Sequence, residues 1–163
     1  MRHTPTVHMI HGYLGAGKTT FARKLERELP AIRFTQDEWV TGIFGNGPLD
    51  PDSMLKPIRD LIEGCWTRCV ELGLNVVLDN GFWSRRERNE TRTKAVNLGA
   101  NYRLYSLAVP DEIAWTRVEQ RNRDLHGSWF IDRNAFETLR TLRGFDPLGP
   151  DEPHVVIPLD RPE

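Results

Sequence analysis

The feature that most constrains this chain is the glycine-rich run from Gly12 to Thr19, which reads GYLGAGKT. It fits G-x-x-x-x-G-K-[ST], a pattern whose glycines let the backbone curl so that successive N–H groups approach one anion. Lys18 can reach the β- and γ-phosphates of a nucleotide, and the Thr19 hydroxyl can ligate Mg²⁺. The run therefore predicts a phosphate-binding P-loop, also called Walker A. The residues expected to hold the phosphates are Gly12, Gly15, Ala16, Gly17, Lys18, Thr19 and Thr20.

The segments on either side of this loop match the setting that a P-loop needs. Residues 6–11 contain β-branched and apolar side chains and are typical of a strand. After the loop, apolar residues recur at helical spacing over 17–29, until Pro30 stops the helix. Such a helix aims its positive N-terminal end at the same phosphates. A chance glycine-rich turn is the alternative, and the order strand, loop, helix argues against it.

Length and charge restrict the classes to which the chain can belong. Its 163 residues favour one domain, 1–163, and 39% hydrophobic with 28% charged residues is ordinary for a globular protein. The net charge of −1 provides no overall field toward nucleic acid or an anionic membrane. No apolar run approaches the ~20 residues of a membrane span, and no signal-peptide core follows the first residues. We therefore expect a cytoplasmic protein with no membrane partner.

Strand and helix signals alternate along the rest of the chain. Further strands are predicted at 31–35, 75–79, 102–109 and 154–157. Further helices are predicted from residue 36, at 53–72, at 84–98, from residue 110 and at 133–143. Turn-forming residues predict a loop at 41–52 and a turn at Asn80–Gly81. This alternation predicts an α/β protein with the three-layer P-loop NTPase fold. We expect about five mostly parallel strands, helices on both faces and a small lid at about 121–133.

Three residues with reactive side chains are expected to pack rather than react. Cys65 and Cys69 are four apart, so they share one face of a predicted helix, and no second His or Cys pair completes a zinc site. We interpret them as small core residues, in preference to a redox or metal role. His11 directly precedes the P-loop and is expected to pack at the end of its strand.

Asp37 is the candidate catalytic base. In parallel sheets ligands bind outside the carboxyl ends of strands, so an acid just after the strand at 31–35 is well placed. Its carboxylate can hold an acceptor hydroxyl and take the proton. Glu38 is an alternative base, and Asp37 could instead cap the helix that begins beside it. A P-loop on a neighbouring strand favours the catalytic interpretation.

Asp79 ends the continuous apolar strand at 75–79. A carboxylate at that point can support Mg²⁺ together with Thr19, or grip the acceptor, and the sequence leaves both roles open. The alternative is a structural aspartate that caps the turn at Asn80–Gly81. We favour the functional interpretation because the residue follows a buried strand.

Two groups of arginines are candidates for contacts with phosphate or substrate. Arg121 and Arg123, and with less weight Arg117, lie near the predicted lid and could neutralise charge on the transferred group. Residues two apart cannot both face one point on a helix, and a solvated helix face is the alternative. The second group, which shares one helical face, could bind an anionic substrate or simply be solvated: Arg85, Arg88 and Arg92. Aromatic residues flank the two acid motifs and could stack on an acceptor, but we favour packing in the core: Trp39, Phe82 and Trp83.

The P-loop, Asp37, the Asp79-Asn80-Gly81 segment with Arg88 behind it, and the lid arginines together resemble a known group. These are the small P-loop kinases of the polynucleotide kinase, zeta toxin and chloramphenicol phosphotransferase kind, often described as AAA-type ATP-binding proteins. The resemblance covers most of the chain. It implies that Asp37 activates the acceptor hydroxyl and that Arg121 and Arg123 touch the phosphates.

One departure from that group concerns the acceptor. Polynucleotide kinases place an arginine three residues after the acid to hold a substrate phosphate, and this chain has Val40 there. The difference argues against a nucleic-acid end as acceptor, as does the nearly neutral net charge. Nucleic acid stays an unfavoured alternative.

The sequence thus predicts an ATP-dependent phosphotransferase that uses Mg²⁺ and acts on a hydroxyl of a small molecule. ATP is the default donor over GTP because no base-reading motif is visible. A nucleotide or polynucleotide 5′-hydroxyl kinase is one alternative. A nucleotide-binding regulatory ATPase without an acceptor is the other.

Overall fold

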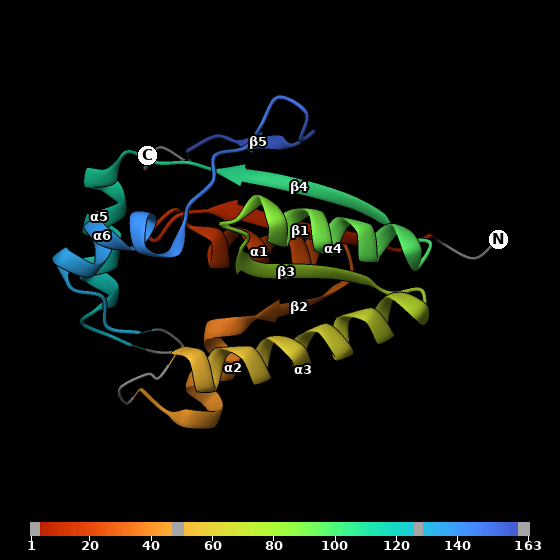
Figure 1. The fold of residues 1–163 in the computed structure, drawn as a ribbon, viewed down its shortest axis with the longest axis horizontal. Coiled ribbons are helices and arrows are strands. Elements are labelled where there is room, and N and C mark those ends of the chain that lie inside the picture. The colour runs from red at the N-terminus through yellow and green to blue at the C-terminus, as the bar shows by residue number, and fades with distance from the viewer. Residues whose placement is uncertain (1–3, 47–50, 126–128, 160–163) are drawn as a thin grey trace.

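The computed structural model describes residues 4–46, 51–125 and 129–159, in which strands and helices alternate (Figure 1). The strands are β1 (Thr6–Gly12), β2 (Ala31–Thr35), β3 (Asn75–Gly81), β4 (Asn101–Leu107) and β5 (Val155–Ile157). The helices are α1 (Lys18–Glu28), α2 (Gln36–Phe44), α3 (Pro51–Glu71), α4 (Arg85–Asn97), α5 (Asp111–Arg121) and α6 (Arg133–Arg143). Within these ranges no helix is both long and apolar enough to cross a membrane.

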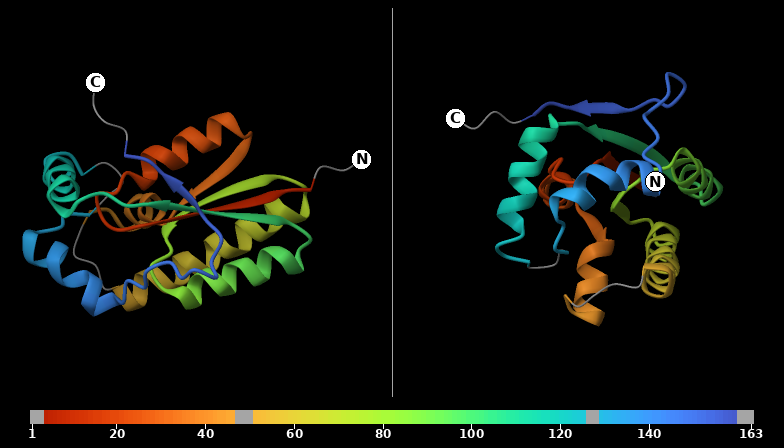
Figure 2. Two further views of the ribbon diagram at one scale, coloured as in Figure 1. Left: turned by 90° about the horizontal axis from the view of Figure 1, so that it is seen from above. Right: turned by 60° about the vertical axis from the view of Figure 1, so that its left-hand side comes forward.

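The five strands form one parallel sheet in the order β2-β3-β1-β4-β5. Helix α1 covers one face, and α3 and α4 cover the other, as the two views of Figure 2 show. The arrangement confirms the predicted three-layer α/β fold. It also sets β2, β3 and β1 side by side, so their carboxyl ends meet at one edge of the sheet.

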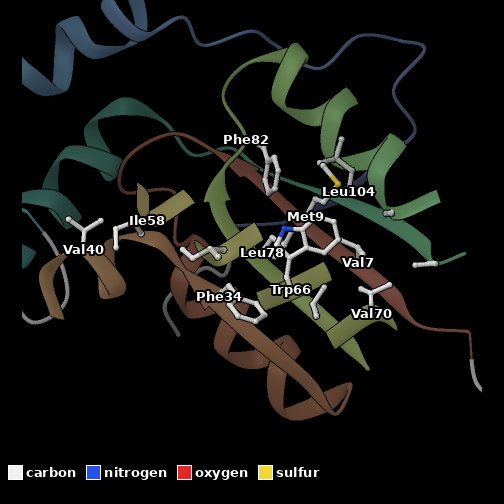
Figure 3. Close-up of a cluster of buried hydrophobic side chains, with 14 residues drawn as sticks. Val7, Met9, Phe34, Val40, Ile58, Trp66, Val70, Leu78, Phe82 and Leu104 are labelled. Atoms are coloured by element: carbon white, nitrogen blue, oxygen red, sulfur yellow. The ribbon is translucent and has the colours of Figure 1, made fainter. Parts of the chain in front are cut away.

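The continuous apolar strands of the sequence follow from burial on both faces. On β1, Val7 and Met9 enter the core beneath α3 and α4, whereas Ile10 enters the core beneath α1. On β3, Leu78 joins the first core and Val77 the second. Figure 3 shows Val7, Met9 and Leu78 in the first core. A strand covered on both sides needs apolar residues at every position, which hides the usual alternation.

The loop predicted at 41–52 is shorter than expected. Helix α2 continues to Phe44, because the exposed Gly42 costs a helix only about 1 kcal/mol relative to alanine. Helix α3 begins at Pro51, since proline is favoured at the first helical position, where no N–H is needed. Residues 47–50 lie outside the described part of the chain. The density of turn-forming residues therefore overstated the irregular segment at both ends.

The turn predicted at Asn80–Gly81 is part of β3 instead. Gly81 pairs with His11 of β1, past an irregularity in the register. Gly81 has a φ of 81°, so the end of the strand still uses the freedom of glycine. Pairing with β1 thus prevails over the local turn preference, and the predicted turn comes slightly later.

The prediction that both cysteines are core residues is wrong for Cys65, which is exposed, while Cys69 is half-buried against the core. The buried stripe of α3 repeats every four residues and runs one position away from Cys65. Its members are Ile58, Ile62, Trp66 and Val70. The wide apolar face in the sequence included positions on the edge of this stripe.

Candidate active site

The P-loop and the two candidate acids come together at the carboxyl edge of the sheet. The P-loop follows β1, Asp37 is the second residue of α2 after β2, and Asp79 lies near the end of β3. Because these strands are neighbours in the order β2-β3-β1, the three features face one region. Helices α5 and α6 lie at this same end of the sheet in Figure 1. Residues distant in the chain thus meet where α/β proteins bind ligands.

The P-loop packs tightly against α5. Gly15 has a φ of 71°, and a Cβ there would lie 2.2 Å from the Ala114 carbonyl oxygen, so only glycine fits. Gly17, with a φ of 91°, directly precedes α1, whose N-terminus therefore opens at the loop. The Lys18 Nζ donates a hydrogen bond of 2.8 Å to the Tyr13 carbonyl across the loop. Loop, lysine and helix N-terminus have the arrangement that binds phosphates.

Thr19 and Asp79 form the oxygen pair expected of a magnesium site. The Thr19 hydroxyl donates to Asp79 Oδ2 at 2.8 Å, and the Thr35 hydroxyl donates to the same oxygen at 3.2 Å. Asp79 is only 6% exposed. Magnesium binds to one or two protein oxygens and takes the rest of its ligands from phosphates and water. Thr19 and Asp79 fit that requirement, and no motif in the sequence had pointed to Thr35.

Asp37 lies among opposing charges. Burial raises the pKa of its carboxyl group above the usual range, and the negative charge of Asp79 adds to the rise. Lys18, Arg121 and a hydrogen bond from the Trp129 side chain lower the pKa but do not cancel the effect of burial. A carboxylate with a raised pKa is a stronger base while it stays ionised at neutral pH. Two acids and two cations therefore occupy one site.

Burial disfavours the charged form of both cations of this site. Burial lowers the pKa of Lys18, and the charges of Asp79 and Asp37 only partly offset it. Burial also lowers the pKa of Arg121, with Asp37 as the opposing charge. The Nε of Arg121 is buried and has no hydrogen-bond partner among the described residues. A bound anion, such as a phosphoryl group, would supply the missing acceptor.

The lid arginines divide differently from the prediction. Arg121 lies close enough to Asp37 for the two charges to interact, but Arg123 is exposed beyond the end of α5. Arg117, given less weight, places Nη1 3.4 Å from the Gly15 carbonyl oxygen of the P-loop. Arg117 and Arg121 are four apart and so share one face of α5, a spacing that could have singled them out. Thr20, predicted to touch phosphate, is also exposed.

Arg88 does not belong to an exposed basic patch. Its side chain is 2% exposed and forms an ion pair with Glu152, also buried, at 2.7 Å. Arg85 is exposed and Arg92 is half-buried, so the three arginines predicted to share one helical face do not form one exposed surface. The expectation that Arg88 touches substrate is therefore wrong. Its acidic partner is 64 residues away in the chain, too far for helical spacing to suggest.

The aromatic residues near the acids mostly pack, as expected, with one addition. Phe82 is 1% exposed, and Trp39 packs on Phe34. Trp83 also donates a hydrogen bond from its indole nitrogen to the Gly12 carbonyl at 3.0 Å. Trp129 was not predicted; it lies in the lid segment and contacts Asp37.

The lid predicted at 121–133 is described only in part, because 126–128 lie outside the described residues. Its described ends are tied together by Asn122. The Asn122 side chain donates to the Ile131 carbonyl at 2.7 Å and accepts from its N–H at 3.1 Å. These two bonds fix the segment that carries Trp129 relative to the end of α5.

Comparison with known proteins gives a consistent picture. A family model described as AAA domain matches residues 7–144. No curated protein matches the sequence. Among solved structures, a chain of the Pnkp1/Rnl/Hen1 RNA repair complex has a TM-score of 0.72 at 23% identity. That match covers 86% of this chain and 44% of the other, so this chain spans less than half of it.

Two further structures match along most of both chains. Kti12 of Chaetomium thermophilum, solved with ADP-AlF3, has a TM-score of 0.72 at 20% identity and covers 96% of this chain and 91% of its own. The APS kinase CysC of Mycobacterium tuberculosis, solved with AMPPNP and APS, has a TM-score of 0.63 at 17% identity. It covers 98% of this chain and 91% of its own. At these identities the likeness establishes a shared fold, that of the P-loop kinases.

Proposed function

This chain belongs to the AAA domain family, and we propose that it is an ATP-dependent kinase which transfers the γ-phosphate to a hydroxyl of a small molecule. The observation that carries the proposal is the meeting of Lys18, Asp37, Asp79 and Arg121 beside the P-loop. A site for binding nucleotide alone needs phosphate contacts and a metal. A half-buried carboxylate among the cations adds what transfer to a hydroxyl requires.

The donor side is formed by the P-loop and the groups around it. The loop amides, the N-terminus of α1 and Lys18 would hold the β- and γ-phosphates. Thr19 and Asp79 would hold Mg²⁺, which neutralises charge on the phosphates when bound. Arg121 would supply Nε to an oxygen of the transferred group, and that contact would satisfy an N–H that has no hydrogen-bond partner among the described residues.

The acceptor side is centred on Asp37. Its carboxylate would accept the proton of the acceptor hydroxyl as that oxygen bonds to the γ-phosphorus and the bond to ADP breaks. The Trp129 side chain would hold the carboxylate in orientation, and the raised pKa makes it a better proton acceptor. The products are a phosphate monoester and ADP.

An acceptor without a phosphate of its own fits this site best. Polynucleotide kinases have an arginine at the position that Val40 occupies in this chain. Val40 is fully buried in the core, at 0% exposure. The cations of the site, Lys18 and Arg121, are needed by the donor. A polynucleotide 5′-hydroxyl is the second candidate, favoured by the fold shared with the RNA repair chain.

An acceptor screen tests the proposal. We expect some hydroxylated metabolites or antibiotics to stimulate ADP release from ATP and Mg²⁺, whereas oligonucleotides with 5′-hydroxyl ends do not. Stimulation by oligonucleotides alone would select the second candidate. Asp37→Asn should lower transfer by about 10²- to 10⁴-fold and spare ADP binding, because general base catalysis contributes that much.

A matched control is available for that variant. Asp60→Asn removes an exposed carboxylate on α3 that forms an ion pair with Lys56, and it should leave transfer unchanged. Unchanged ATP turnover in Asp37→Asn, with no acceptor that stimulates the wild-type chain, would instead point to a regulatory ATPase. Full transfer activity in Asp37→Asn would refute the assignment of the base.

A further inference from the structure

Arg88 is a buried arginine whose hydrogen bonds are all made within the protein. It lies in the first turn of α4 and is 2% exposed. Nε and Nη2 donate to the two carboxylate oxygens of Glu152 at 2.7 and 3.0 Å. Nη1 donates to the carbonyls of Phe82 at 3.0 Å, Trp83 at 3.2 Å and Asp146 at 3.2 Å. The guanidinium thus joins the end of β3 to the C-terminal part of the chain.

The segment held by Arg88 is the C-terminal strap, residues 144–152, which leads from α6 toward β5 beside the start of α4 (Figure 1). Asp146 N–H donates to the Trp83 carbonyl at 2.8 Å, and Gly149 N–H donates to Glu152 at 3.0 Å. Phe145 of the strap stacks on His11, with ring centroids 4.9 Å apart. The strap therefore rests on the end of β3 and on the residue that precedes the P-loop.

The turn at Phe82 and Trp83 contacts the start of the P-loop directly. The Phe82 carbonyl, which accepts from Arg88, also accepts from His11 Nδ1 at 2.9 Å. The indole of Trp83 donates to the Gly12 carbonyl at 3.0 Å. Two hydrogen bonds thus connect the turn to two consecutive residues at the end of β1. A shift of the turn would be transmitted to the peptide units that begin the loop.

The backbone at this turn is built to allow these contacts. Gly81 has a φ of 81°, and a Cβ there would lie 2.8 Å from the Trp83 indole nitrogen. Phe82 has a φ of 46°, the only positive value among described residues other than glycine. A bulky residue persists in this conformation only where its surroundings hold it. Here Arg88 and His11 hold its carbonyl from two sides.

From these contacts we propose that Arg88 and Glu152 are positioning residues for the phosphate-binding loop. They act through the turn at Phe82 and Trp83, so the C-terminal strap sets the affinity of the loop for nucleotide phosphates. The inference rests on the proposed binding of nucleotide by the P-loop and is independent of the acceptor. Supporting residues that fix a binding loop from behind affect affinity without touching the ligand.

The test measures binding of ADP with Mg²⁺ to the full chain by calorimetry, at a temperature well below the Tm of each variant. Trp83→Phe keeps the ring but removes the donor to Gly12, and Glu152→Gln removes the charge that anchors Arg88. We expect each to raise the Kd for ADP by roughly tenfold. The Kd of the double variant for ADP should be no higher than the higher Kd of the two single variants, because both changes act along one path.

Two controls separate positioning from stability. Val70→Ala shortens a core residue of α3 that is 2% exposed. Trp39→Phe alters a tryptophan of α2 that packs on Phe34. Both should lower Tm and leave the Kd unchanged. Wild-type Kd values in Trp83→Phe and Glu152→Gln, with only a lower Tm, would overturn the inference. If Glu152→Gln does not fold, Trp83→Phe decides. A wild-type chain that binds no ADP would overturn the proposed function and this inference with it.

Discussion

Two charge clusters in this molecule, one buried and one largely half-buried, differ in how fully their hydrogen bonds are satisfied. Around Arg88, the donors reach a carboxylate and backbone carbonyls, all within the chain. Around Lys18 and Arg121, burial lowers the pKa of both cations, and the Arg121 Nε has no partner among the described residues. A buried donor without a partner costs about 1–3 kcal/mol. The first cluster therefore holds structure, and the second gains most from a bound anion.

The largest difference between the clusters should appear when Arg121 is removed. We expect Arg121→Ala to lower phosphoryl transfer by about 10³-fold, because an arginine on the transferred group contributes at least that much in related chemistry. ADP affinity should change far less, since ADP lacks the γ-phosphate. Initial rates of ADP formation with the acceptor from the screen give the measurement.

Arg123→Ala is the matched control for that prediction. Arg123 is exposed two residues beyond Arg121, so its loss should leave the rate nearly unchanged. Equal losses in the two variants would show that the lid arginines act through general charge and that the geometry of Arg121 is not special.

The cluster around Arg88 should lose stability in acid. Hydrogen bonds from Arg88 lower the pKa of Glu152 from 4.5 to about 2. A lowered acid pKa adds stability that is present above pH 4.5 and is lost as the pH falls toward 2. At 1.36 kcal/mol per pKa unit, the contribution is about 3 kcal/mol. Denaturant unfolding of wild type and Glu152→Gln at neutral pH and near pH 2 measures this contribution. The difference in free energy of unfolding between the two proteins should be smaller near pH 2.

An exposed ion pair provides the contrast for that measurement. Lys94 pairs with Glu63, whose side chain is 52% exposed. Glu63→Gln should change the free energy of unfolding by less than about 1 kcal/mol. If wild type and Glu152→Gln differ in free energy of unfolding by the same amount at neutral pH and at pH 2, the assigned ionisation of Glu152 is wrong.

The smallest expected effect separates backbone strain from the contact at Trp83. Gly81 and Gly73 have φ values of 81° and 82°, but only a Cβ at Gly81 would meet a neighbour, the Trp83 indole nitrogen. Both Gly→Ala variants should lose about 1 kcal/mol or more of stability from strain. Only Gly81→Ala should also weaken ADP binding, by a few-fold. Equal ADP affinities in the two variants would show that the turn at Phe82 and Trp83 does not influence the P-loop.

The meeting of the P-loop, Asp37 and Asp79 at one edge of the sheet followed from patterns in the sequence. The P-loop pattern contains its own geometry, and strand order then places Asp37 and Asp79 beside it. Alternating strands and helices were likewise sufficient for the fold. Errors in the segments were local, as where α2 extends to Phe44 and β3 extends through Gly81.

The remainder depended on contacts between distant segments. Arg88 looks like one of several arginines on a helix until Glu152 is seen beside it. Trp129 of the lid segment contacts Asp37, and the residues next to Trp129 in the chain give no indication of that contact. The choice between Arg117 and Arg123 depended on where α5 ends. Burial and the end point of a helix are tertiary properties, so residue type and spacing alone could not assign these roles.

Phosphorus NMR of the chain with ATP, Mg²⁺ and the acceptor from the screen shows whether the cluster of Lys18, Asp37, Asp79 and Arg121 transfers a phosphoryl group. A phosphate monoester should appear with wild type and Asp60→Asn, and should be lost with Asp37→Asn although that variant still binds ADP. A monoester formed equally fast by Asp37→Asn, or inorganic phosphate as the sole product of the wild-type chain, would show that this cluster does not transfer phosphate to a hydroxyl in the way proposed.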